Sequence, residues 1–136
     1  MVNTATELAL AAKMVAAYVL LTIASVVTLV LLSAAGSGQA TSEAWGHAVI
    51  VAVFSALLPL RLRAARRGSG KAALAVVIMA VVVLAVNLVE AILPHAFPVW
   101  MRVEMLAVVV VMATLLAAMR GALARRKTPE TPSPVR

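Results

Sequence analysis

The sequence predicts an all-α, polytopic membrane protein with four transmembrane helices, on the evidence of composition, run length and residue pattern. Of its 136 residues, 64% are hydrophobic and 12% are charged, and the mean hydropathy is +1.07. A soluble domain of this size could not cover so much Ala, Val and Leu with water-facing groups. With their flanks, the apolar runs reach the roughly 20 residues that cross a bilayer. They show no period-2 alternation, which indicates helices and not a membrane barrel.

Four apolar runs follow one another along the chain. No charge occurs between Lys13 and Glu43, and the run 72–89 holds only Asn87 as a strongly polar residue. We therefore expect one transmembrane domain over 1–124, with helices at about 8–33, 43–62, 71–93 and 99–123. The basic, proline-containing segment 125–136 is expected to be a disordered cytoplasmic tail.

The basic residues predict the orientation of these helices. All 12 Lys and Arg residues except Arg102 lie in the connection 61–71, near the first run, or toward the C-terminus. In a chain of four membrane-spanning helices, these three regions are on the same side of the membrane. The positive-inside rule makes that side cytoplasmic, so both termini are predicted inside (N-in/C-in) in the cell membrane. The net charge of +7 then reflects topology. No soluble basic helix with interleaved aromatics is predicted, and nucleic acid is not expected as a partner.

The first run is interpreted as a retained helix. Small residues follow Leu32, as they do at a signal-peptide cleavage site, but the apolar region is about 19 residues long where a signal peptide has about 7–15. Tyr18, Thr22 and Ser25 follow i, i+4, i+7 spacing and share one helix face. We expect them to form interhelical hydrogen bonds or bonds to the preceding turn, in preference to lining a solute path.

Two helix stripes are interpreted as packing surfaces. Small residues recur at four-residue spacing in the second run, which favours close helix approach, at Ala44, Ala48, Ala52 and Ala56. His47 lies off this stripe and is expected to be an interface hydrogen-bonding residue. A methionine stripe in the fourth run is interpreted as packing in preference to a copper site, and consists of Met101, Met105, Met112 and Met119.

Ionisable and amide groups gather between the third and fourth runs, where Pro94 and Pro98 break the helical pattern. Such groups are costly near a bilayer, which makes this region the candidate functional site. On the outer side of the membrane, the candidate polar cluster consists of His47, Asn87, Glu90, His95, Arg102 and Glu104.

Three interpretations of this cluster stay open. The favoured one is a pair between Arg102 and Glu90 that joins two helices, because Arg102 and Glu104 diverge by about 200° around their own helix. In the second, the facing carboxylates of Glu90 and Glu104 hold a proton or a cation. The third adds His47 and His95 as ligands of a divalent metal, although their spacing matches no known metal motif.

The run from LPLRLRAARRGSG through VNLVEAILPHAFPVWMRVEM resembles uncharacterised small four-helix integral membrane proteins of high-GC actinobacteria. The resemblance covers roughly 57–119, and its most distinctive pieces are the E-x-x-x-P turn, FPxW and RxE. It implies a bacterial cytoplasmic membrane and carries over no catalytic or binding residue. Small multidrug transporters also have four helices, but their defining Glu lies in the first helix, where this chain has no acid past Glu7.

Two function classes follow from these observations. We favour a non-enzymatic accessory or interaction subunit that works through helix packing in the lipid bilayer, with a membrane-protein partner or further copies of itself. The alternative is a small proton- or cation-coupled transporter that uses Glu90 and Glu104. The first is favoured because nothing ionisable lies near the midplane, where carriers place their sites. No enzyme and no cofactor are predicted, since the chain has no cysteine, nucleophile–base pair, phosphate loop or metal motif.

Overall fold

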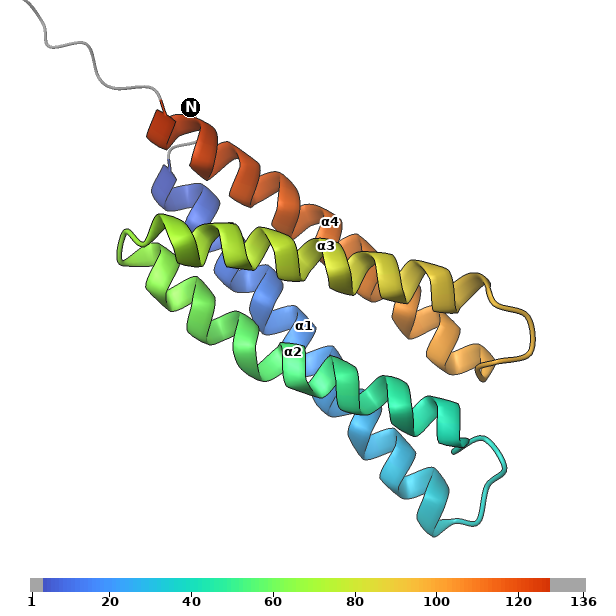
Figure 1. The fold of residues 1–136 in the computed structure, drawn as a ribbon. Coiled ribbons are helices and arrows are strands. Elements are labelled where there is room, and N and C mark those ends of the chain that lie inside the picture. The colour runs from blue at the N-terminus through green and yellow to red at the C-terminus, as the bar shows by residue number, and fades with distance from the viewer. Residues whose placement is uncertain (1–3, 128–136) are drawn as a thin grey trace, which may run out of the picture.

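The computed structural model of the protein describes residues 4–127, which form four helices joined by short loops (Figure 1). The helices are α1 (Thr4–Ala34), α2 (Ser42–Arg66), α3 (Gly70–Ile92) and α4 (Val99–Lys127). Each is long and apolar enough to cross a membrane, which confirms the prediction of an all-helical chain with four candidate spans.

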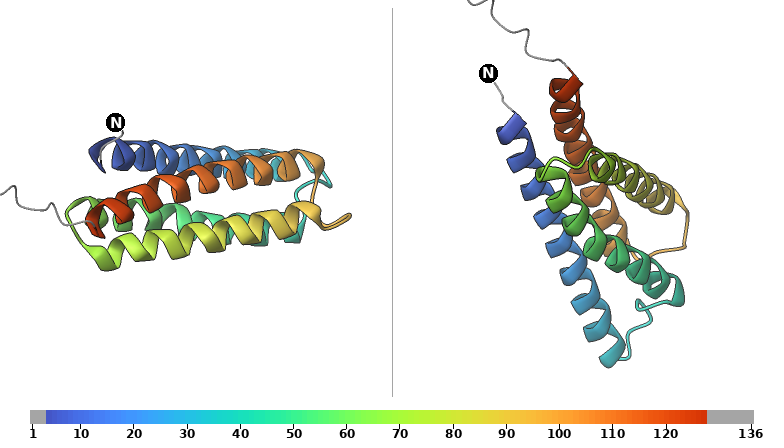
Figure 2. Two further views of the ribbon diagram at one scale, coloured as in Figure 1. Left: turned by 90° about the horizontal axis from the view of Figure 1, so that it is seen from above. Right: turned by 60° about the vertical axis from the view of Figure 1, so that its left-hand side comes forward.

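Successive helices run in opposite directions and close into a bundle. Both α1 and α3 pack against α2 and against α4, so each helix has two neighbours (Figure 2). The start of α1, the end of α4 and the loop 67–69 lie together, and we call this the basic end. The loops 35–41 and 93–98 lie together at the other end, which we call the opposite end.

Hydroxyl and glycine residues set the helix boundaries. The side chains of Thr41 and Ser69 cap α2 and α3 by accepting the backbone N–H three residues later, each at 3.2 Å. Gly68 follows the end of α2 with a φ of 101°, a left-handed conformation that other residues rarely adopt. Gly68 and the Ser69 cap together let the chain turn from α2 into α3 within the short loop 67–69.

The end of α4 differs from the prediction. The helix continues to Lys127, so residues 125–127 are helical and do not belong to a disordered tail. Ala, Leu and Arg favour helix, and basic residues are stabilised at a helix C-terminus. Arg126 also ties this end to α2, because its Nη2 donates to the carbonyl of Ala65 at 2.8 Å. The rest of the predicted tail, 128–136, lies outside the described residues.

Gly121 on α4 leaves room for the side chain of Glu7 from α1 at the basic end. A Cβ atom added at Gly121 would overlap the carboxylate of Glu7, which lies directly against this position. The same carboxylate pairs with Arg125, whose Nε is 3.4 Å from Oε2 of Glu7. Glu7 of α1 therefore occupies the space beside Gly121 and pairs with Arg125, both on α4.

The core consists of two apolar clusters. The larger one extends from the basic end to the level of Tyr18 and Val51, and the smaller one lies at the opposite end around Leu29 and Met101. The four methionines of the predicted stripe are buried with at most 1% exposure and belong to these clusters, as expected of packing residues.

The alanine stripe of α2 packs along only part of its length. Ala44 and Ala48 are buried, whereas Ala52 is half-buried and Ala56 is exposed. Four residues turn a helix by about 400°, so a strict four-residue stripe drifts by about 40° at each step. The residues of α2 that are buried instead follow mixed three- and four-residue steps, at Ala44, His47, Ala48, Val51, Leu58, Leu62 and Ala65.

Candidate functional site

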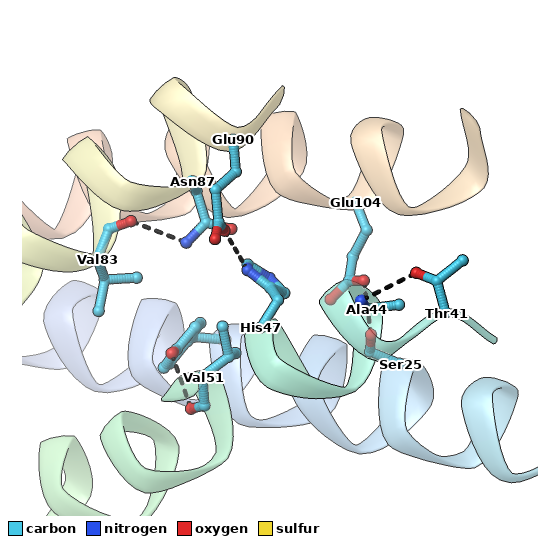
Figure 3. A network of polar contacts seen from close by, with 10 residues as sticks. Ser25, Thr41, Ala44, His47, Val51, Val83, Asn87, Glu90 and Glu104 are labelled. Carbon is cyan, nitrogen blue, oxygen red and sulfur yellow. Dashed lines mark hydrogen bonds and ion pairs between the residues drawn. The ribbon is translucent and has the colours of Figure 1, made fainter. Parts of the chain in front are cut away.

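A layer of polar side chains crosses the bundle toward its opposite end, and every helix contributes to it (Figure 3). We call it the polar layer, and its members are Ser25 from α1, His47 from α2, Asn87 and Glu90 from α3, and Glu104 from α4. Ser25 and Asn87 lie where one cluster gives way to the other. His47 and Glu104 lie within the smaller cluster, between Ala44 and Ala48 on α2 and between Met101 and Met105 on α4. Buried polar groups must find partners, so the layer restricts how the four helices can align.

His47 and Glu90 join α2 to α3. The Nδ1 atom of His47 contacts Oε2 of Glu90, with the side chains 2% and 21% exposed. The ring of Phe97 packs edge-on against the imidazole at a centroid distance of 5.9 Å, an arrangement that aromatic pairs prefer. The contact confirms the expectation that His47 forms an interface hydrogen bond.

Ser25 and Glu104 join α1 to α4 in the same layer. The hydroxyl of Ser25 donates to Oε2 of Glu104 at 2.7 Å, the usual length of an O–H···O hydrogen bond. Glu104 also interacts electrostatically with His47, and Figure 3 shows the imidazole between the two glutamates. A positive charge on His47 therefore has two carboxylates to balance it.

Tyr18 and Thr22 lie on α1 between the polar layer and the basic end, and they form hydrogen bonds to α2 and within α1. The hydroxyl of Tyr18 donates to the carbonyl of Val51 on α2 at 3.0 Å, and the hydroxyl of Thr22 donates to the carbonyl of Tyr18 at 3.0 Å. Tyr18, Thr22 and Ser25 are all buried. The prediction that these three residues share one helix face is confirmed, as is the prediction of hydrogen bonds to another helix or to the preceding turn.

Asn87 is buried and keeps one unused acceptor. Its Nδ2 donates to the carbonyl of Val83 at 2.8 Å, whereas its side-chain oxygen has no partner among the described residues. The adjoining cavity, lined by Val51 and Phe54 among others, measures about 10 Å³. This volume is at the lower limit for one water molecule and too small for a larger solute.

Arg102 and His95 lie outside the polar layer. Arg102 donates from Nε to the carbonyl of Ala91 at 2.8 Å and so satisfies a backbone group in the last turn of α3. The predicted pair between Arg102 and Glu90 is therefore wrong, because the carboxylate of Glu90 faces α2 and His47. His95 is exposed in the loop 93–98 with a φ of 60°.

The third interpretation of the cluster, a divalent metal with His47 and His95 among its ligands, has no counterpart within residues 4–127. No group of three or more His, Asp or Glu side chains there is placed to hold a metal ion. His47 is buried in α2, while His95 lines a recess between the loops of the opposite end.

The predicted cluster did not include Ser25, although its position on the same helix face as Tyr18 and Thr22 was a usable signal.

Replacing Ser25 with alanine should lower the free energy of unfolding by about 1–3 kcal/mol, because the half-buried carboxylate of Glu104 then lacks its donor. Thr28→Ala is the matched control, since the hydroxyl of Thr28 is exposed and bonds only to Ala24 in its own helix. Unfolding followed by tryptophan fluorescence in detergent micelles measures both. Equal losses for the two variants would show that the bond between α1 and α4 adds nothing.

Comparison of the chain with protein-family models, with curated proteins and with solved structures found no match. The chemistry of the site therefore follows from its own geometry. That geometry allows two uses of the polar layer: fixing the alignment of four helices, or holding a proton between His47 and either carboxylate.

Proposed function

We propose that the protein is a small, non-enzymatic membrane protein that acts as an accessory or interaction subunit through the packing of its helices. The supporting observation is that the buried polar residues of the described chain, Thr22, Ser25, His47 and Asn87, all lie in or beside the polar layer. Between the polar layer and the basic end, the interior of the bundle is filled by the side chains of the larger apolar cluster. Transporters usually place polar sites near the midplane, whereas the polar layer lies toward the opposite end of all four helices.

The outer surface supplies the faces for such contacts. Large apolar side chains are exposed on each helix, including Leu20 (67%), Val49 (60%), Ile78 (55%) and Val110 (66%). In a bilayer these faces meet lipid or another helix, and helix association there depends on close packing. A partner helix or a second copy of the chain can use any one of the four faces without disturbing the polar layer.

Cross-linking at these four positions tests the proposal. The chain has no cysteine, so single variants at Leu20, Val49, Ile78 and Val110 each carry one thiol for a photoreactive reagent. In native membranes we expect a discrete cross-linked protein from one face and none from the other three. Discrete products from none of the four positions would contradict an interaction subunit.

We further propose that the basic end faces the cytoplasm of a bacterial cell, with both termini inside. Gly38 in the loop 35–41 and Arg67 at the basic end are exposed, and Gly38 has open space around it. A membrane-impermeant maleimide should label Gly38→Cys in intact cells and Arg67→Cys only after permeabilisation. Labelling of Arg67→Cys alone in intact cells would reverse the orientation.

A second candidate function is a small proton- or cation-coupled transporter that uses Glu90 and Glu104. The observation that favours it is a buried histidine between two carboxylates, beside the unused acceptor of Asn87. Ionisable groups at membrane depth often mark proton or ion pathways.

Flux through reconstituted vesicles separates the two candidates. For an interaction subunit, vesicles that contain the protein should dissipate an imposed pH or cation gradient no faster than empty vesicles. A transporter would instead show flux that Glu104→Gln abolishes and Glu43→Gln preserves. Glu43 is the matched control because it is exposed in the first turn of α2, outside the polar layer.

A further inference from the structure

An open groove of about 400 Å³ lies between α1 and α2 in the half of the bundle near the basic end. This volume falls within the range of ligand-binding clefts. Val15 and Leu62, both buried, form its floor, while Ala12, Ala16 and Pro59 contribute small or compact side chains to its walls. Because these wall residues are short, the two helices leave space between them along this stretch.

Two arginines, Arg63 and Arg66, line one end of the groove in the last turns of α2. Both are exposed. The ion pairs of the described residues are His47 with Glu90 and Arg125 with Glu7, so neither arginine has an acidic partner there. The remaining lining residues are apolar, which makes the groove positively charged at one end and apolar along its length.

We infer that this groove binds an anionic phospholipid, with the phosphate on Arg63 and Arg66 and an acyl chain between α1 and α2. Arginine matches phosphate with two parallel hydrogen bonds, and basic pockets between membrane helices bind anionic head groups. The groove runs from Arg66 toward Pro59 and Leu20, which is the direction from the head-group level into the bilayer.

A phospholipid suits this groove better than a protein segment does. An apolar helix would fill the space along Ala16 and Pro59 but leave the charges of Arg63 and Arg66 unbalanced. An anionic amphiphile satisfies both ends of the groove at once. The inference concerns a ligand of the α1–α2 face and is independent of whether another face binds a partner.

Lipid retention by the purified full-length chain tests the inference. The chain is incubated with vesicles of phosphatidylcholine that contain a tenth phosphatidylglycerol, extracted, and weighed with its bound lipids by native mass spectrometry. We expect retained phosphatidylglycerol over phosphatidylcholine, and a loss of roughly tenfold to thirtyfold in the double variant Arg63→Gln, Arg66→Gln. Ala16→Leu should cause a comparable loss with no change in charge, because it fills the groove from an exposed position.

The matched control is the double variant Arg61→Gln, Lys71→Gln, which removes the same charge from exposed positions outside the groove. It should retain the lipid as the unchanged chain does. Equal losses in both charge variants would reduce the effect to general attraction between a basic surface and anionic lipid, and would overturn the site. Unchanged lipid retention in Ala16→Leu would also overturn the lipid site. If Ala16→Leu instead converted a dimer to a monomer, the occupant of the groove would be a second copy of the chain, and the lipid site would again be overturned.

Discussion

Replacing His47 with leucine should lower the free energy of unfolding by about 3 kcal/mol. The change leaves Glu90 inside the bundle without its partner, and stranding one member of a buried ion pair costs about 3–5 kcal/mol. We expect the lower part of that range because the side chain of Glu90 is 21% exposed and gains some solvation. The loss can be measured by denaturant unfolding in detergent micelles, with the fluorescence of Trp45 and Trp100 as the signal.

His95→Asn is the matched control for this variant. His95 is exposed in the loop 93–98, and asparagine tolerates its φ of 60° better than most residues. Its free energy of unfolding should change by less than about 0.5 kcal/mol, as is usual at surface positions. A loss in His95→Asn as large as that in His47→Leu would contradict the distinction between the polar layer and the loop.

Replacing Ala48 with leucine should destabilise the bundle by about 1–3 kcal/mol, because the added side chain must enter a packed core. Ala48 is 4% exposed and belongs to the cluster of Leu29 and Met105 at the opposite end. The side chains around it would have to leave their preferred rotamers, or α2 would have to move away from its neighbours. Thermal unfolding in the same micelles measures the change.

Ala56→Leu supplies the control on the same helix. Ala56 belongs to the same four-residue stripe but is exposed, so a leucine there projects outward and should leave the stability nearly unchanged. If Ala56→Leu destabilised the protein as strongly as Ala48→Leu, the stripe would pack along its whole length, for example against another copy of the chain.

The sequence was sufficient to predict the helices because their signal is local. Runs of apolar residues near 20 positions long, bounded by Pro, Gly and charges, define spans without any knowledge of what each span contacts. The depth of the polar groups followed from the same reasoning, since distance along a helix is fixed at about 1.5 Å per residue. Four of the candidate residues, His47, Asn87, Glu90 and Glu104, therefore lie in one layer.

The pairing within that layer could not be predicted, because it depends on which helices are neighbours. Glu90 and Arg102 are close in sequence and face one loop, which favoured a bond between them. In the bundle α3 contacts both α2 and α4, and the carboxylate of Glu90 points to His47 on α2. Which way the carboxylate of Glu90 points is decided by how the four helices pack against one another. The residue pattern of one helix does not show which helix will be its neighbour.

The most direct test of the account is the coupling energy between His47 and Glu90, measured by a double-mutant cycle of His47→Leu, Glu90→Leu and the combined variant. If the polar layer fixes the alignment of α2 and α3, the combined variant should lose less stability than the two single losses added, with a coupling above about 1 kcal/mol. Replacing both partners with apolar groups removes the stranded charge that each single variant creates. Single losses that add to within about 0.5 kcal/mol would contradict the account, because independent residues do not hold two helices together.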